Sequence, residues 1–145
     1  AKTCILEHMA KEKELSEELP ESVAVGLFEV SCLEIRKLLM GRHRKVIDGV
    51  LNLMLAKYRD SAQEICDKFS GIFASLRKVP KDIEGVAEQR EFIGTVPAEI
   101  TKLGPDMKRC IEAYSTLESF AVRMANDDFS QRWRVFGCPK QTQDL

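Results

Sequence analysis

Apolar side chains recur at helical spacing through the middle of the chain. From residue 47 to residue 76 the intervals between successive apolar positions are 4, 3, 4, 4, 3, 4, 3 and 4. The positions are Ile47, Leu51, Met54, Tyr58, Ala62, Ile65, Phe69, Ile72 and Leu76. These intervals keep one face of a helix apolar, with a single 4–4 step that locally disturbs the heptad seam. We therefore predict a long helix from Ser31 to about Lys78. Apolar residues beside the seam, such as Val50 and Phe73, widen it, so it should pack against two or more helices.

A second apolar seam follows a break at Pro80. Asp82 is placed to cap a helix that carries Ile83, Val86 and Ile93, and we expect that helix to end near Gly94 or Pro97. Beyond it the intervals alternate between 4 and 3, through Val96, Ile100, Leu103, Met107, Cys110, Tyr114, Leu117, Ala121 and Met124. Gly104-Pro105 falls within this register, so the pattern predicts a kink or an interruption there.

The N-terminal part has two different patterns. Residues 4–19 are typical of a charged helix ended by Pro20, with Ile5, Met9 and Leu15 on its apolar side. Residues 23–30, VAVGLFEV, are rich in β-branched and aromatic side chains and predict one short strand or extended segment. Period-2 alternation would place Val23, Val25 and Leu27 opposite Phe28 and Val30.

The stretch NDDFSQRWRVFGCPK, residues 126–140, combines a helix start, an aromatic row and a stop. Asn126 or Asp127 can cap a short helix that places Phe129, Trp133 and Phe136 on one side. Gly137 supplies a left-handed C-cap and Pro139 prevents continuation. We interpret these five residues, Phe129, Trp133, Phe136, Gly137 and Pro139, as an inter-module packing site. If the Trp133 ring is buried at that joint, Trp133→Ala would cost about 3–5 kcal/mol.

Together the patterns predict a mainly α fold, an elongated antiparallel helical bundle with one short strand or extended segment. We expect a single bundle segment over residues 1–145. Within it, 1–30 would be an N-terminal helix and extended segment, 31–124 the long-helix bundle, and 125–145 an aromatic turn. The chain begins without an initiating Met and ends in a polar stretch, as a fragment or a trimmed protein would.

Composition narrows the possible partners and compartments. The 22 Lys and Arg residues nearly balance the 23 Asp and Glu residues, and the net charge is -1, so we expect no overall attraction to nucleic acid or to a membrane. The five cysteines are widely separated, which favours a reduced, cytosolic compartment. The chain has no secretory leader and no run of about 18 apolar residues, so we expect neither secretion nor membrane spanning.

We expect no catalytic, cofactor-binding or metal-binding residues. A phosphate-binding loop would need a glycine-rich turn, and neither His8 nor His43 belongs to a metal-ligand motif. Asp127 and Asp128 are explained more simply by helix capping than by acid–base chemistry. Cys66 and Cys110 lie on or beside the seams and fit core positions.

One basic cluster, GRHRK at residues 41–45, is a candidate partner-contact patch. Its members Arg42, His43, Arg44 and Lys45 could bind an acidic partner such as tubulin or RNA, although runs of charge are more often solvated helix faces.

Three stretches resemble the tail of axonemal dynein heavy chains, in order and in approximate spacing. They are VGLFEVSCLEIRKLL (25–39), ICDKFSGIFASLRKVPKDIEGVAEQREFIGTVP (65–97) and NDDFSQRWRVFGCPK (126–140). The matching positions are Gly26, Phe28, Val30, Ile65, Cys66, Phe69, Pro80, Ile83, Glu84, Arg90, Glu91, Phe92, Asp127, Asp128, Phe129, Trp133, Gly137 and Pro139. The chain departs from the family pattern at Gly85, where a second acidic residue is usual, at Cys138, where Trp is usual, and at Gly104-Pro105.

The resemblance implies a non-catalytic tail segment shortly before the linker of the motor. Such a segment is a structural rod that joins the AAA+ ring and its linker to the anchorage on the cargo doublet, in a parent chain that is a microtubule-stimulated ATPase. The implied partners are other dynein heavy chains, intermediate and light chains, and docking or doublet-microtubule proteins. The implied location is the cytoplasm and cytoskeleton, in the ciliary or flagellar axoneme.

Two alternatives belong to other classes. A spectrin-like scaffold or adaptor bundle would bind protein partners through an exposed helix face and should show internal repeats. A small helical enzyme would place convergent polar residues on the inward helix faces, whereas the seams counted above are almost wholly apolar.

Overall fold

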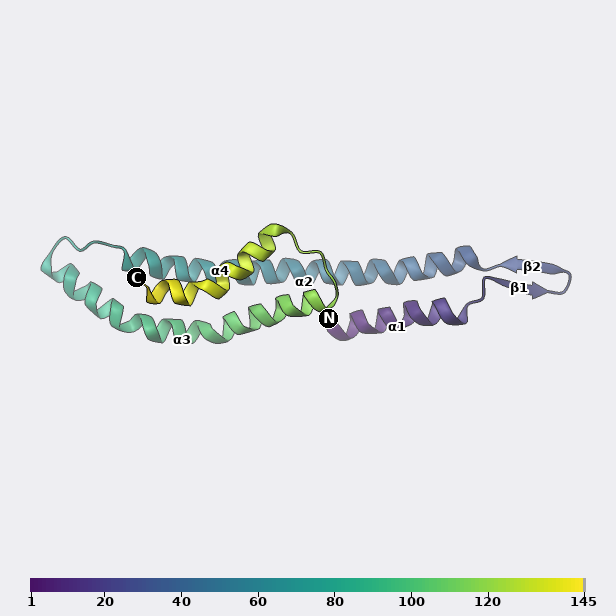
Figure 1. Cartoon of the computed structure of the whole chain (residues 1–145), viewed down its shortest axis with the longest axis horizontal. Coiled ribbons are helices and arrows are strands. Elements are labelled where there is room, and N and C mark those ends of the chain that lie inside the picture. Colours follow the sequence, from purple (N-terminus) through teal and green to yellow (C-terminus); the bar gives the residue numbers. More distant parts are fainter. Residues whose placement is uncertain (145) are drawn as a thin grey trace. The chain divides into compact units, whose positions relative to one another are not determined.

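The computed structural model describes residues 1–144 and confirms a mainly α protein with a small antiparallel sheet (Figure 1). The elements are α1 (Lys2–Glu18), β1 (Ser22–Val25), β2 (Phe28–Ser31), α2 (Leu33–Leu76), α3 (Ile83–Ser119) and α4 (Asn126–Gln143). The chain divides into two compact units, Ala1–Met54 and a second that begins at Leu55, and α2 continues from the first into the second.

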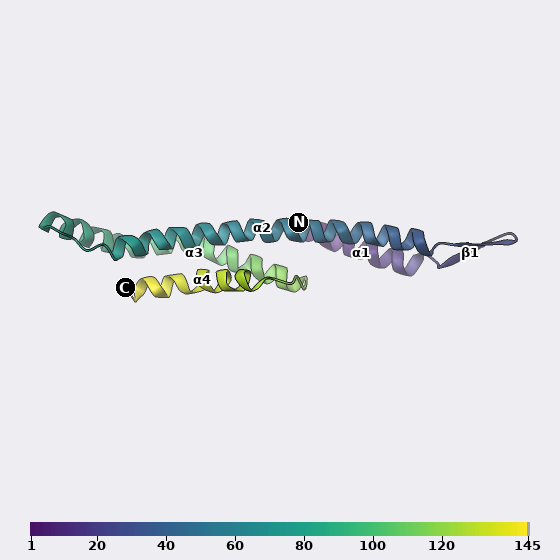
Figure 2. The same cartoon turned by 90° about the horizontal axis from the view of Figure 1, so that it is seen from above.

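The first unit is a helical hairpin closed by strands. The β1–β2 connection reverses the chain, so that α1 lies antiparallel to the first part of α2 in both views (Figures 1 and 2). Ile5 of α1 and Ile47 of α2 are fully or almost fully buried. Near the strands, Arg36 donates from Nη2 to the carbonyl oxygen of Ser16 at 2.7 Å. This bond satisfies an acceptor that the end of α1 would otherwise leave unpaired.

The segment predicted as one strand is a β-hairpin. Val23 pairs with Val30 and Val25 pairs with Phe28 in an antiparallel register. Gly26 has a φ of +62°, and glycine at the first position of a two-residue connection suits a hairpin turn. The predicted face assignment was wrong, because the turn brings Val23 and Val25 to the same face as Phe28 and Val30.

The second unit contains the later half of α2 with α3 and α4. Phe69, Tyr114, Leu117 and Val135 come from these three helices and are fully buried.

Along the two predicted seams, the buried positions are Ile47, Leu51, Met54, Ala62, Ile65 and Phe69 on α2 and Val96, Leu103, Met107, Cys110, Tyr114 and Leu117 on α3. The counted register is thereby confirmed for most of its length.

Two predicted boundaries of α3 were wrong. No break occurs at Gly94 or Pro97, and α3 continues as one ribbon through Pro97 and Pro105, bowed along its length (Figure 1). Burial on both sides of these prolines offsets their missing N–H groups. The helix ends at Ser119, so Ala121 and Met124 lie beyond it. The predicted cap at Asp82 is confirmed, because its carboxylate accepts from the Gly85 N–H at 2.7 Å.

The predicted stop near the C-terminus was also wrong. Gly137 and Pro139 lie inside α4, which continues to Gln143. Val135, Cys138 and Thr142 are buried at intervals of 3 and 4, so one face of α4 is held against the bundle on both sides of the proline. That burial outweighs the roughly 3 kcal/mol that an interior proline costs a helix. Residues 126–143 are therefore a helix and not a short aromatic turn.

Candidate functional site

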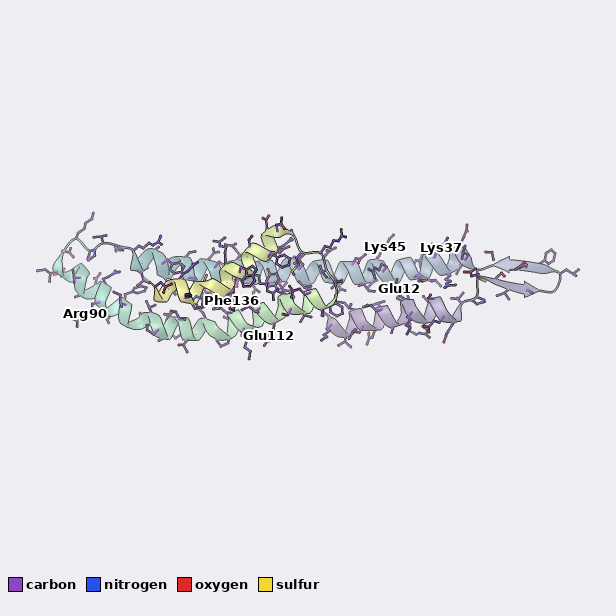
Figure 3. All side chains as sticks on the ribbon, viewed as in Figure 1. Glu12, Lys37, Lys45, Arg90, Glu112 and Phe136 are labelled. Carbon is purple, nitrogen blue, oxygen red and sulfur yellow. The ribbon has the colours of Figure 1, made fainter. Side chains whose placement is uncertain are left out.

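The exposed side of α4 carries a row of large aromatic residues. Phe129, Trp133 and Phe136 are 43%, 65% and 62% exposed, and Figure 3 labels Phe136 on this helix. The Trp133 and Phe136 rings meet edge to face, with their centroids 5.9 Å apart. We call these three residues the aromatic face. Aromatic side chains are enriched at protein interfaces, and Trp133 and Phe136 have the edge-to-face geometry that aromatic pairs prefer.

A buried ion pair fixes the start of α4. Asp128 is 1% exposed and accepts two hydrogen bonds from Arg59 of α2, one from Nε and one from Nη2 at 2.7 Å. The hydrogen bonds from Arg59 lower the pKa of the Asp128 carboxyl group below its usual value. The bidentate geometry holds α4 in one orientation on α2. Phe129 is the next residue, so the ion pair also positions the aromatic face.

Asp128 has a second role at the helix start. Its Oδ2 accepts from the Ala125 N–H at 3.1 Å, so the acid in the third helical position caps the helix from within. The prediction that Asn126 or Asp127 would be the cap was wrong, because the capping residue is Ala125. The sequence reasoning also missed Arg59. Its separation of 69 positions from Asp128 gives no local signal of the pairing.

Polar contacts continue the attachment of α4 along its side. Gln131 donates from Nε2 to the Gln63 Oε1 at 3.1 Å, and Arg132 forms an ion pair with Glu118 of α3. Arg134 beside Trp133 is exposed. The helix is therefore held by both of its neighbours while the aromatic face stays open to solvent.

Three cysteines are buried in the interior behind the aromatic face. Burial raises the pKa of the Cys66 and Cys110 thiols, and it raises the pKa of Cys138 to about 11. The predicted core positions of Cys66 and Cys110 are confirmed. Thiols at such pKa values are protonated at neutral pH and are poor nucleophiles.

Tyr114 lies in the same interior, and burial raises its pKa to about 12. Its hydroxyl group has no hydrogen-bond partner within the protein, the one such buried side-chain atom in the described part of the chain. A buried hydroxyl group without a partner lowers the stability of the folded state. The charges of the nearby Arg59–Asp128 pair also act on the pKa of Tyr114.

The basic cluster at residues 42–45 is divided by the fold. Arg42 and Lys45 are exposed. His43 Nδ1 instead lies 2.8 Å from His8 Nδ1 of α1, and Arg44 forms long ion pairs with Glu12 and Asp48, at 3.9 and 3.8 Å. Two of the four predicted contact residues are thus already engaged within the first unit. Their role toward a partner stays a prediction.

Within residues 1–144, no group of three or more His, Cys, Asp or Glu side chains is arranged to hold a metal ion. A groove of about 330 Å³ lies between α2 and α3. Its polar lining includes Lys57, Glu64, Lys68, Asp106 and Arg109. These charges alternate in sign, which is typical of a solvated helix surface. In the same residues, no helix is both long enough and apolar enough to cross a bilayer.

Comparison with known proteins gives one consistent result. The chain is 23% identical to dynein axonemal heavy chain 1 of Homo sapiens over 137 residues, which are 94% of this chain and 3% of the human protein. The resemblance to axonemal dynein heavy chains is confirmed. The Mus musculus protein of the same name is 20% identical over 94% of this chain and 3% of its own length, and the Rattus norvegicus protein is 21% identical over 79% and 2%. No family model matches.

This dynein similarity concerns a small piece of very long proteins. The chain spans about 3% of the length of the first two relatives. It is therefore related to one segment of an axonemal dynein heavy chain, and the activities of the whole relatives are not carried over with the similarity.

Proposed function

We propose that this chain is a non-catalytic tail segment of an axonemal dynein heavy chain. It would act as a structural rod between the AAA+ motor with its linker and the anchorage on the cargo doublet. The observation that carries this proposal is the aromatic face of α4, which is rigidly positioned and yet exposed. The similarity to axonemal heavy chains over 94% of the chain supports the same assignment.

The aromatic face is suited to transmit load to a neighbouring module. Each of its side chains offers roughly 150–250 Å² of surface, so docking would bury on the order of 300 Å² of what is now exposed. At about 25 cal/mol per Å² this corresponds to a gross gain of about 7 kcal/mol. The Arg59–Asp128 pair would pass force from the docked module to α2 through hydrogen bonds and not through a flexible loop.

The proposed occupant of the aromatic face is the next segment of the same heavy chain. Intramolecular docking needs little affinity, because the connection keeps the effective concentration of the neighbour high. In this arrangement Gly137 and Pro139 belong to the docking helix itself. Their contribution is to shape the surface of α4 next to Phe136.

A second contact would involve the exposed part of the basic cluster. Arg42 and Lys45 on α2 are free of the ion pairs that engage Arg44, and Figure 3 marks Lys45 on that helix. We assign them to an acidic surface of another axonemal component, such as an intermediate chain, a light chain or a docking protein. Such a rim contact would depend on salt, because it is solvent-exposed.

The experiment is a double substitution, Trp133→Ser with Phe136→Ser, in the full heavy chain in ciliated cells. We expect purified dynein to keep its ATPase activity while doublet sliding slows, because the motor works but its load path is weakened. The matched control is Leu53→Ser, which removes an exposed apolar side chain from α2 outside the aromatic face.

Two measurements make the result decisive. Circular dichroism of the 145-residue chain should be the same for both variants, which excludes unfolding as the cause. A photo-reactive residue at position 133 should cross-link within the heavy chain. Sliding at the wild-type rate, or cross-links formed only to an unrelated scaffold partner, would overturn the proposal in favour of an adaptor bundle.

A further inference from the structure

The two histidines of the chain lie against each other. His8 is on α1 and His43 is on α2, and their Nδ1 atoms are 2.8 Å apart although 35 positions separate them in the sequence. The ring centroids are 5.0 Å apart with an interplanar angle of 48°. Both side chains are half-buried. The first unit thus brings two imidazole nitrogens to one point between its two helices.

This geometry is close to that of two ligands on one metal ion. In a tetrahedral site with zinc–nitrogen bonds of about 2.0–2.1 Å, two ligating nitrogens lie roughly 3.3 Å apart. Rotation of the two rings would have to widen the Nδ1–Nδ1 distance from 2.8 Å to about 3.3 Å and turn both lone pairs toward the ion. In the hydrogen-bonded pair one Nδ1 carries a proton and the other accepts it. On metal binding that proton moves to Nε2 of its own ring through solvent, so that both Nδ1 lone pairs face the ion.

The surroundings of the pair are open and of mixed charge. A hollow of about 460 Å³ is lined by Glu7, His8, Ala10, Lys11 and His43, which gives an ion and its water ligands a way in. Lys11 lines the hollow, and its ammonium group forms an ion pair with Glu14 at 2.8 Å.

Arg44, a second basic residue near the two histidines, also has a carboxylate partner. Glu12 lies one turn beyond His8 on α1, and Arg44, beside His43 on α2, forms its long ion pair with it. Lys11 and Arg44 therefore each have a carboxylate partner, and the two imidazole rings supply the nitrogen donors.

We propose that His8 and His43 bind a divalent transition-metal ion of the zinc class between α1 and α2. Imidazole nitrogen suits zinc, copper and nickel, and water would complete the coordination, because no third protein ligand stands in place among residues 1–144. The ion would join α1 to α2 at the end of α1 away from the hairpin. The inference is independent of the dynein assignment, since it rests on this pair alone.

The test is a titration of the 145-residue chain with Zn²⁺, followed by calorimetry and by NMR of the histidine ring protons. We expect one equivalent to bind and to shift the signals of both rings together. Either His8→Asn or His43→Asn should weaken binding at least tenfold. Binding should also weaken as the pH falls, because protons compete for both imidazoles.

Controls separate this site from adventitious binding to thiols. Cys4→Ser removes the thiol one turn before His8 and should leave the affinity unchanged, and both histidine variants keep all five cysteines. Co²⁺ in place of Zn²⁺ should show no thiolate charge-transfer absorption. Absence of binding by the unmodified chain, or equal binding by the His43→Asn variant, would overturn the proposal.

Discussion

Asp128 is almost completely shielded from water, yet its charge has to be balanced inside the protein. Arg59 supplies that balance with two hydrogen bonds, and the Ala125 N–H supplies a third. The Arg59 side chain is itself 47% exposed, so it can return to water if its partner is removed. A substitution at position 128 therefore costs hydrogen bonds but strands no buried charge.

We predict that Asp128→Asn lowers the free energy of unfolding by about 2 kcal/mol, the scale of hydrogen bonds to charged groups. Urea denaturation of the 145-residue chain measures the change. Asp127→Asn is the matched control, because the neighbouring acid is exposed. An equal loss in both variants would show that the helix dipole, and not the ion pair, is responsible.

The pH dependence has a definite sign. The folded pKa of Asp128 is lowered from 3.8, so between the folded and unfolded values the unfolded chain binds the additional proton. The contribution to stability is complete above about pH 4 and is lost as the pH falls through the folded pKa. The difference in stability between the wild type and Asp128→Asn should be constant above about pH 4 and should shrink as the pH is lowered below it.

At the scale of elements, α4 and the hairpin show how burial and turn geometry override a local pattern. Gly137 followed by Pro139 is a common way to end a helix, and the sequence pattern predicted a stop there. The helix continues because Cys138 and Thr142 are buried beyond Gly137, and the Thr142 hydroxyl donates to the Cys138 carbonyl oxygen at 2.8 Å. Tertiary contacts offset the destabilising effect of the proline, and such contacts cannot be predicted from the local sequence pattern.

We predict that Pro139→Ala stabilises the chain by about 1–3 kcal/mol, because it restores a helical N–H and removes a steric conflict within α4. Thermal and urea unfolding measure the gain, and circular dichroism should show no loss of helix. Pro20→Ala, outside the helices, is the control and should gain less. A destabilised Pro139→Ala variant would mean that the helix ends near Gly137 after all.

The hairpin depends on one backbone angle. Gly26 has φ at +62°, in the left-handed region where a side chain is disfavoured by about 1–2 kcal/mol. We predict that Gly26→Val lowers the protection of the β1 and β2 amides against hydrogen exchange by about tenfold. Gly41→Ala is the control. That glycine is inside α2 with open space around it, so alanine should stabilise the helix by about 1 kcal/mol.

At the scale of the whole molecule, Trp133 is the residue at which the proposed joint can be tested. The estimate that Trp133→Ala costs about 3–5 kcal/mol of stability required a buried ring. The Trp133 ring is 65% exposed, so that estimate does not apply to this chain. We predict that Trp133→Ala changes the stability of the 145-residue chain by less than about 0.5 kcal/mol, as for a surface position.

Tryptophan fluorescence reports the solvent exposure of Trp133 directly, because Trp133 is the single tryptophan. In the 145-residue chain its emission should be that of a solvent-exposed indole and be quenched by iodide. In the longer heavy chain, docking of the adjoining segment should shift the emission to shorter wavelength and protect it. A shielded indole in the 145-residue chain alone would contradict both the geometry and the proposed joint.

The sequence predicted those parts of the fold that depend on neighbours along the chain. The intervals of 3 and 4 identified the seams of α2 and α3, and Asp82 was recognised as a cap, because burial and capping act within one or two turns. The aromatic side of α4 followed from the same spacing. Its exposure did not, because the spacing of apolar residues does not tell a core face from a docking face.

What the sequence by itself determined is the helical class, the register of the seams and the resemblance to axonemal dynein heavy chains. Only the tertiary structure decided that α3 and α4 pass through their prolines, that residues 23–30 fold back on themselves, and that Arg59 meets Asp128 and His8 meets His43. The physical reason is distance along the chain. Periodicity and capping depend on residues within one or two helical turns, whereas these outcomes depend on contacts between residues up to 69 positions apart.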